Sequence, residues 1–291
     1  MRTVSDVAYK IPAPILFLTS GVSQYTGAAC AVGLFALMTP ATMAWWRITI
    51  AALVLIVWRQ PWKRHLSARE WMASALFGVV MTGMNIAFYE AIARLDMGIV
   101  VALEFIGPVA LAVCARRHWR SWLGSALALT GVVLICGISA IHTTTTTIIG
   151  IAYSLLAGGL WAIYMILGQR IATTRSGTTS LAIGCAASSV IYLPMAVHDA
   201  AYIATSPTIA IVVIAVGILS TVIPYTLDQV ALHRLDTSTF AILTALLPVT
   251  SLVVGALTLH QIPAPASIAG VLCVSLAVAI VSQRERNREA E

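Results

Sequence analysis

Residues 97–114 of the chain, MGIVVALEFIGPVALAVC, form an apolar run that carries one carboxylate, Glu104, near its middle. The run is long enough to cross a bilayer as a helix. Pro108 follows four residues later and has no backbone N–H to donate to the Glu104 carbonyl. An ionised carboxylate at the bilayer centre costs about 2.5–3.5 kcal/mol on insertion scales, so such residues usually face a cavity and mark a pathway. The alternative interpretation is structural, with Glu104 neutralised by a proton or a neighbouring helix and holding helices together.

The composition of the whole chain agrees with a membrane protein. Of 291 residues, 59% are hydrophobic and 10% are charged, with a mean hydropathy of +0.93, whereas a soluble domain has about 25% charged residues. The apolar runs do not alternate with polar residues as the strands of a β-barrel do. The net charge of +6 lies in short loops rather than in one patch, so we predict no nucleic-acid partner. No cysteine pair has metal-ligand spacing, and we predict no metal and no cofactor.

Apolar runs of about 18–25 residues recur with short connections. We predict an all-α polytopic protein with ten membrane-spanning helices, near residues 13–35, 41–58, 71–93, 97–114, 122–140, 148–168, 179–197, 208–232, 237–258 and 265–282. The first run is interpreted as a retained span and not as a cleaved signal peptide, because its long apolar part holds polar residues such as Ser20 and Gln24.

The lysines and arginines predict the orientation of the spans. Given ten spans, one side of the membrane collects fifteen of them, and the other side has Arg94 alone. Positive charge is retained on the cytoplasmic side. Both termini of this multi-pass protein are therefore predicted to be cytoplasmic.

The chain repeats itself at an offset of 140 residues. The sequence AIARLD at 91–96 matches ALHRLD at 231–236, and seven of nineteen positions from 91 to 109 are identical. This offset equals five spans, an odd number, so the two copies cross the membrane in opposite directions. Inverted repeats of this kind are typical of alternating-access carriers, although duplication kept only for packing is an alternative. The predicted units are residues 1–140, residues 148–282 and a cytoplasmic tail, residues 283–291.

Four formally charged residues fall within the predicted spans: Arg47, Glu90, Glu104 and Asp228. Arg47 and Glu104 lie at similar depth, so they could pair, or Arg47 could receive a substrate carboxylate; snorkelling to the outer surface is the alternative for Arg47. Glu90 is close to the outer end of its span and is interpreted as a rim residue. Asp228 follows Pro224, which deprives the Ser220 carbonyl of its helical donor and predicts a kink.

The other candidate pathway residues are polar or aromatic side chains within predicted spans: Gln24, Asn85, Tyr89, Trp161, Tyr164 and Tyr225. Asn85 and Tyr89 are one helical turn apart and share a face. Trp161 and Tyr164 also share a face and could line a cavity, or they could serve packing. Nucleotide-binding and intramembrane-protease motifs are absent from the sequence, so we predict no ATP-driven pump, no enzyme and no catalytic residue.

These residues resemble the EamA-type branch of the drug/metabolite transporter superfamily, and within it the inner-membrane threonine/homoserine exporter group. The segments that carry the resemblance are GMN at 83–85 with FY at 88–89, VALEF at 101–105 with GP at 107–108, WAIY at 161–164 with GQR at 168–170, and LST at 219–221 with PY at 224–225. The sequence departs from the family at Leu247, where relatives commonly carry Glu, and around His260 and Gln261, where an acidic residue often ends the span.

The resemblance implies two inverted five-helix bundles, a central cavity, and location in the cell inner (plasma) membrane as a multi-pass protein. It also implies export of small neutral amino acids, with inward proton flow as the driving force. We therefore predict a secondary transporter for threonine- or homoserine-like zwitterions, in which Glu104 binds the substrate amine or a proton. The expected partners are a small-molecule metabolite, membrane lipid and protons, and the expected state is a monomer or a weak dimer. The alternatives are an exporter of drugs or lipophilic cations, and a non-transporting membrane scaffold or enzyme.

Overall fold

The computed structural model describes residues 13–115, 119–139, 144–172, 177–234 and 246–289. Over these residues the chain is helical and contains no strand. Some predicted features lie outside this range, namely residues 237–245 of the ninth predicted span, the repeat positions Leu235, Asp236 and Leu243, and the basic residues Arg2, Lys10, Arg116, Arg117 and Arg175.

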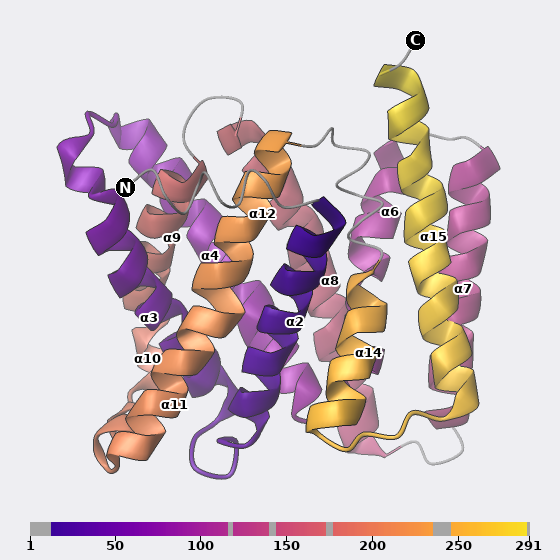
Figure 1. Cartoon of the computed structure of the whole chain (residues 1–291), viewed down its shortest axis with the longest axis horizontal. Helices are drawn as coiled ribbons and strands as arrows, with labels where there is room; N and C mark the ends of the chain where they lie inside the picture. The colour runs from indigo at the N-terminus through magenta and orange to yellow at the C-terminus, as the bar shows by residue number, and fades with distance from the viewer. Residues whose placement is uncertain (1–12, 116–118, 140–143, 173–176, 235–245, 290–291) are drawn as a thin grey trace.

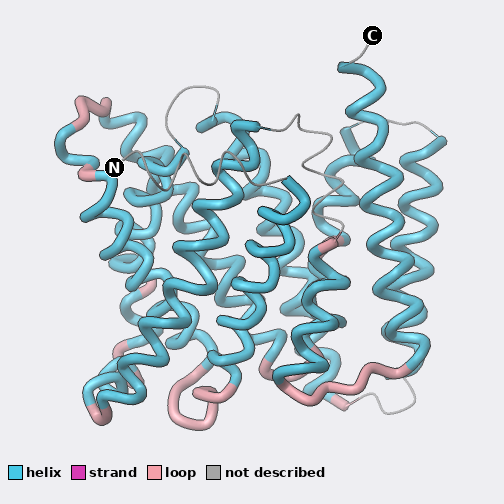
Figure 2. The backbone as a smooth tube through the Cα atoms, viewed as in Figure 1, coloured by secondary structure: helices cyan, strands magenta, loops and turns pink. Residues whose placement is uncertain are grey.

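The helices run side by side between two loop-bearing ends (Figures 1 and 2). Those of the first half are α2 (Ala13–Val32), α3 (Pro40–Arg59), α4 (Ala68–Ile92), α5 (Met97–Glu104), α6 (Ile106–Ala115) and α7 (Trp119–Ser139). Those of the second half are α8 (Thr145–Ala172), α9 (Gly177–Ile191), α10 (Leu193–Ala196), α11 (Pro207–Gly217), α12 (Ile223–Arg234), α14 (Leu247–Thr258) and α15 (Pro265–Glu289). The short elements are the 3₁₀ turns η1 (Pro61–Lys63) and η3 (Ala200–Ala204) and the π-helical turn η4 (Ile218–Val222).

Local capping signals set where several helices begin. The Thr39 hydroxyl accepts from the Thr42 N–H, and Pro40 occupies the first helical position of α3. Ser67 and Glu70 form a capping box at the start of α4, with Ser67 N–H donating to the Glu70 carboxylate (2.8 Å). Side-chain oxygens at these positions satisfy N–H groups that have no partner within the helix.

Three predicted spans are not single α-helices. The run 97–114 breaks at Phe105 into α5 and α6, because Pro108 removes the donor that would continue the ladder at the Glu104 carbonyl. The run 179–197 divides into α9 and the single-turn α10, and the run 208–232 contains η4. Within the predicted tail, residues 283–291, α15 continues as a helix to Glu289.

Helices of the two halves pack mainly on one another. α3 and α4 contact α9, α4 also contacts α8, and α2 contacts α12 and α14. α7 and α15 lie side by side at one edge of the molecule (Figure 1). The halves therefore interleave and share a core that includes Tyr89, Val100 and Val216.

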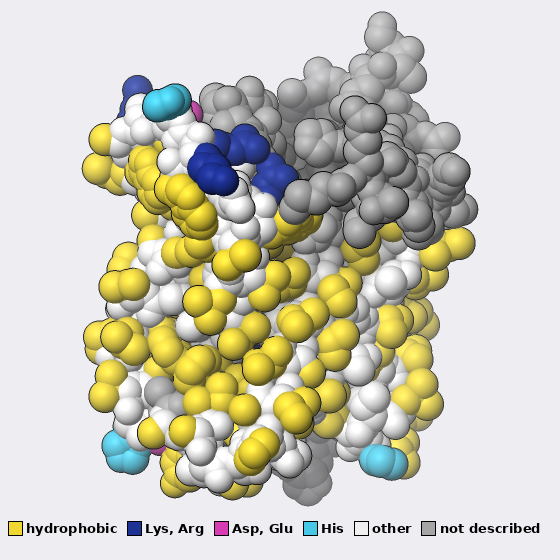
Figure 3. Space-filling view, turned by 60° about the vertical axis from the view of Figure 1, so that its left-hand side comes forward, with side chains coloured by type: hydrophobic (Ala, Val, Ile, Leu, Met, Phe, Trp, Pro, Cys, Tyr) yellow, Lys and Arg dark blue, Asp and Glu magenta, His cyan; other side chains and the backbone are white. Residues whose placement is uncertain are grey.

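The outer surface is apolar over most of its height. Figure 3 shows hydrophobic side chains covering the middle of one face, with lysine and arginine side chains gathered toward its upper end. Large apolar side chains such as Val57 and Met72 are about 70% exposed. Within the described residues, five helical segments are long and apolar enough to cross a membrane: Ile15–Val32, Pro40–Lys63, Ala68–Ile92, Thr145–Gly168 and Pro207–Asp228.

Candidate functional site

The π-helical turn η4, between α11 and α12, forms one side of the candidate site. In η4 the Ile223 N–H bonds to the Ile218 carbonyl, five residues back. The Leu219 carbonyl thereby loses its α-helical donor, and the next possible donor, Pro224, has no N–H. Pro224 also withdraws the α-helical donor from the Ser220 carbonyl. Two adjacent carbonyls in the interior of the protein therefore require donors from elsewhere.

Side chains from the first half supply these donors. Ser23 Oγ of α2 donates to the Leu219 carbonyl (2.8 Å). Arg47 Nη2 of α3 donates to the Ser220 carbonyl (2.6 Å), and Arg47 Nε donates to Thr221 Oγ1 (2.7 Å). The kink that Pro224 predicts is thus a π-helical turn that is bound by the opposite half of the molecule.

Arg47 is fully buried, which excludes the snorkelling interpretation. Its guanidinium lies over the Tyr89 ring, 5.4 Å from the ring centroid. Its third nitrogen, Nη1, is buried and has no hydrogen-bond partner, and the Tyr89 hydroxyl is likewise buried without a partner. Unsatisfied buried polar groups are rare in folded proteins and cost free energy. The site therefore holds a cation with an unused donor, over an aromatic ring whose hydroxyl is also unused.

Glu104 is the last residue of α5 and is 8% exposed. The described residues give its carboxylate no hydrogen bond and no ion pair within 4.0 Å. Glu104 and Arg47 interact electrostatically across a longer distance, so the direct pairing considered from sequence does not occur. Tyr25 of α2 interacts electrostatically with both, and with Asp228. Opposite charges thus occupy one buried cluster without neutralising each other by contact.

Asp228 lies on α12 and accepts a hydrogen bond from α2. Ser20 Oγ, which is buried, donates to Asp228 Oδ1 (2.9 Å) and lies 3.5 Å from the Pro224 carbonyl. Gln24, one turn further along α2, accepts at its backbone carbonyl from Ser220 Oγ (3.4 Å), and its side chain is half-buried. The polar face of the first helix therefore lies against the interrupted helix of the second half.

The candidate aromatic residues on α8 and α12 contact other rings. Tyr164 of α8 stacks on Phe77 of α4 (centroids 4.7 Å apart) and meets Tyr225 of α12 edge-on (6.3 Å). Asn85 is within hydrogen-bonding reach of Tyr225 and donates to the Met81 carbonyl (2.7 Å). Trp161 contacts Phe105, directly after Glu104, in an edge-to-face arrangement (4.5 Å).

Glycines bring α8 against the broken helix. A Cβ on Gly158 would collide with the Glu104 backbone, and a Cβ on Gly107 would collide with the Gly158 backbone. Gly159 has open space around it. α8 can approach the Glu104 carbonyl this closely only because glycine, which has no side chain, occupies the contact point.

The structure brings Arg47, Tyr89 and Glu104 into one cluster. Asn85 and Tyr164 both contact Tyr225 beside it, and Tyr225 also interacts electrostatically with Arg47. Asp228 joins them through Tyr25 and Ser20, whereas Trp161 borders the cluster at Phe105 and Gln24 takes part through its backbone. Sequence reasoning did not select Thr221. A buried Thr gives no local signal, because hydroxyl residues are common in membrane helices and usually bond within their own helix.

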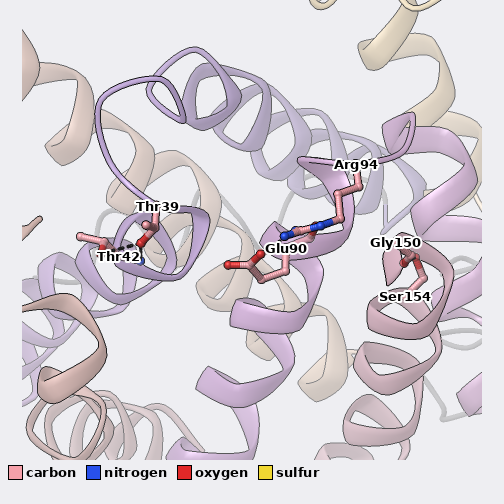
Figure 4. Close-up of polar contacts among 6 residues, drawn as sticks. All are labelled: Thr39, Thr42, Glu90, Arg94, Gly150 and Ser154. Atoms are coloured by element: carbon pink, nitrogen blue, oxygen red, sulfur yellow. Dashed lines mark hydrogen bonds and ion pairs between the residues drawn. The ribbon is translucent and has the colours of Figure 1, made fainter. Parts of the chain in front are cut away.

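Glu90, interpreted from sequence as a rim residue, lies in the last turn of α4. Arg94 lies in the turn that follows α4, and its Nη1 contacts the Glu90 carboxylate in the last turn of that helix (2.6 Å), as Figure 4 shows. Arg94 also lies over the Tyr153 ring of α8, 5.4 Å from its centroid. The Glu90 charge is therefore balanced locally. Within the parts of the chain described here, no group of three His, Cys, Asp or Glu residues could hold a metal ion.

Comparison with known proteins identifies the family. The model of the EamA-like transporter family matches the chain twice, over residues 11–141 and 148–283. The chain belongs to the EamA-like transporter family. As a member of the EamA-like transporters it is a multi-pass membrane protein and a transporter, not an enzyme, which rules out the membrane-enzyme alternative.

Curated relatives of this EamA-like transporter include the threonine/homoserine exporter RhtA of Salmonella typhimurium, 32% identical over 287 residues, which are 97% of this chain and 96% of the relative. RhtA of Escherichia coli is 33% identical over 253 residues, covering 86% and 84% of the two chains. A solved crystal structure superimposes with a TM-score of 0.62 at 15% identity, over 95% of this chain and 98% of the other. That likeness supports the fold.

Proposed function

We propose that this transporter exports small neutral amino acids or related zwitterionic metabolites, with threonine and homoserine as the first candidates, across the inner membrane. The observation that carries the proposal is the buried pair of unsatisfied opposite charges. Arg47 Nη1 has no partner, and the Glu104 carboxylate has none among the described residues. A zwitterion supplies a carboxylate to Arg47 and an amine to Glu104 at once. The curated relatives that share about a third of the sequence carry the name of exporters of such molecules.

The same pair argues against the alternative of lipophilic cations. Aromatic side chains such as Trp161 and Tyr164 would suit a cationic drug. A buried guanidinium with a free edge would repel that cation and would remain without an anion. Competition by neutral amino acids and not by quaternary ammonium compounds is the result expected for the zwitterion proposal.

The proposed transport mode is alternating access by ten spans in two inverted halves, with both termini cytoplasmic. At the offset of 140 residues, α2 corresponds to α8, α3 to α9, α4 to the α11–α12 helix and α6 to α14. Packing follows this correspondence: α4 contacts α8 as α12 contacts α2, and α6 contacts α8 as α14 contacts α2.

The helix directions support the inversion. α4 runs parallel to α9, because Gly78 faces Gly184 and Thr82 Oγ1 donates to Ser188 Oγ (2.7 Å) at the same offset. α3 is joined to α4 by a short connection and runs the other way (Figure 1). α3 is thus antiparallel to α9, its counterpart in the second half. The start of α2 and the end of α15 share the end where Figure 3 shows basic side chains, which favours cytoplasmic termini.

Glu104 has two possible roles within this proposal. Burying an ionised carboxylate without a partner costs free energy, and either a ligand amine or a proton removes that cost. A carrier that uses one residue for both exchanges a proton for the substrate on each cycle. Exchange of this kind would drive export from an inward proton gradient, and Glu104 is the residue we expect to carry it.

Transport by purified protein in proteoliposomes tests the function. We expect threonine flux to increase when a proton gradient is imposed in the direction opposite to that flux. Glu104→Gln should abolish the gradient-driven component, because the amide neither binds a proton nor pairs with an amine. Glu90→Gln is the matched control and should retain it, since that carboxylate is balanced by Arg94. Full gradient-driven flux in Glu104→Gln would disprove the coupling role, and absence of amino-acid flux in the wild type would disprove the function.

A further inference from the structure

The π-helical turn does more than interrupt a helix, because it determines which edge of Arg47 is free. A guanidinium has five N–H groups in a rigid planar fork. Nε and Nη2 are bonded to Thr221 Oγ1 and to the Ser220 carbonyl. The edge formed by these two nitrogens is therefore occupied by the protein. Nη1 remains, and with it the end of the fork that points away from η4.

The two acceptors are themselves held in place by tight packing. Ser220 and Thr221 are fully buried. A Cβ on Gly27 of α2 would approach Leu219 Cβ and Ser220 N to 3.0 Å. A Cβ on Gly217 would come within 2.6 Å of Ile50 Cβ on α3. With α2 on one side and α3 on the other, the η4 backbone that carries Thr221 has little freedom to follow a moving guanidinium.

We propose that Thr221 is a positioning residue for ligand recognition, whose hydroxyl fixes Arg47 so that only its Nη1 end meets the carboxylate of the transported molecule. This inference rests on the proposed function and adds to it the determinant of carboxylate selectivity. Without the hydroxyl, Nε loses its acceptor and the guanidinium turns in its own plane. Its free edge then no longer faces the position of the ligand carboxylate, while the site for the amine is unchanged.

The test compares two ligands that differ only at the carboxyl group, L-threonine and L-threonine amide, by equilibrium binding to the purified full-length protein. Thr221→Val keeps the shape of the side chain and removes the acceptor. We expect it to weaken threonine binding about tenfold, the effect of losing one hydrogen bond to a charged group, and to change binding of the amide by less than about threefold. Thr221→Ser keeps a hydroxyl and should restore the preference for threonine.

Thr82→Val is the matched control, because Thr82 is also fully buried and bonds across the halves, to Ser188. It should lower thermal stability and leave the ratio of the two affinities unchanged. Thr221→Ala provides a second deletion of the hydroxyl if the Val variant does not fold.

Three results would overturn the inference. The ratio of the affinities for threonine and threonine amide could be unchanged in both Thr221→Val and Thr221→Ala. It could change equally in Thr82→Val, or Thr221→Ser could fail to restore it. In these cases the wild type still binds threonine and the proposed function stands. A wild-type protein that binds neither ligand would instead overturn the proposed function, and this inference with it.

Discussion

At the scale of single residues, the interior is defined by groups that lack the partner expected of them. Two nitrogens of Arg47 donate hydrogen bonds to the opposite half, whereas the third has no acceptor. The Tyr89 hydroxyl also has no hydrogen-bond partner. Glu104 lies in the same cluster without a contact. Interiors normally satisfy such groups. An unused donor, hydroxyl and carboxylate in one place indicate a site that is completed by a ligand.

Tyr89→Phe tests this interpretation of the hydroxyl. Removing a buried hydroxyl without a partner should leave stability unchanged or raise it by about 1 kcal/mol, while threonine binding weakens. Thermal unfolding and equilibrium binding measure the two effects. Tyr192→Phe is the control, because the Tyr192 hydroxyl donates to the Val79 carbonyl (3.2 Å) and its loss should destabilise the fold. Equal destabilisation by both variants would contradict the interpretation.

Asp199 connects the two halves outside the membrane-spanning segments. Its Oδ2 accepts from the Thr39 N–H (3.0 Å) at the start of α3, and its Oδ1 contacts His198 Nδ1 (2.7 Å). The hydrogen bonds from His198 and then from Thr39 hold the pKa of Asp199 below its usual value of 3.8. A carboxyl whose pKa is lower in the folded protein stabilises the fold above its unfolded pKa, and this stabilisation is lost as the pH falls through the folded pKa.

We therefore expect Asp199→Asn to be less stable than the wild type at pH 7, because the charged acceptor is lost. The difference in melting temperature should shrink once the pH falls below about 4, the unfolded value for Asp. Thermal unfolding of both proteins across this range measures it. A difference that stays constant down to pH 3 would show that the ionised carboxylate does not contribute.

At the scale of elements, two interruptions define the site, and proline causes both. Pro108 ends α5 at Glu104, and Pro224 leaves two carbonyls of η4 to be satisfied by α2 and α3. A broken helix exposes backbone polar groups that a continuous helix would use internally. In this protein the Ser220 carbonyl accepts a hydrogen bond from Arg47. The Glu104 carbonyl lies so close to α8 that a glycine, Gly158, is needed there.

Adjacent glycines on α8 allow a matched test of this close packing. Gly158→Ala would place a Cβ against the Glu104 backbone and should destabilise the protein by about 1–3 kcal/mol, the usual cost of overpacking. Gly159→Ala meets open space and should be neutral or stabilising by up to about 1 kcal/mol through helix propensity. Thermal unfolding of the two purified variants decides it. Similar stabilities would show that α8 does not approach Glu104 this closely.

At the scale of the whole molecule, the two halves interleave, and basic residues collect at one end (Figure 3). Each half supplies what the other lacks: α2 and α3 donate to η4, and α8 packs on the α5–α6 break. Neither half could form the site by itself. A change of contacts between the halves is therefore a change of the site, which is the property that alternating access requires.

The orientation can be measured by thiol labelling in intact cells. In a variant with the native cysteines replaced by serine, His65→Cys and Ile262→Cys place a thiol at opposite ends of the molecule, and both positions are exposed. If the termini are cytoplasmic, a membrane-impermeant maleimide should label Ile262→Cys and should label His65→Cys only after the cells are opened. The reverse pattern would contradict the predicted orientation.

The sequence alone determined the membrane class, the position of Glu104 in a broken apolar run, the break at Pro224 and the asymmetry of charge. Each of these depends on local composition, hydropathy or a missing N–H group, which are properties of a residue and its neighbours along the chain. The family followed from short motifs for the same reason.

Only the tertiary structure decided which partners these residues have. Arg47 is bonded to Thr221, 174 residues away, and does not touch Glu104. Gly158 is tightly packed, whereas its neighbour Gly159 is open. Distant helices must first pack before a donor meets an acceptor or a Cβ meets a backbone. Hydropathy and spacing specify that a polar residue is buried, and packing selects the group that it faces.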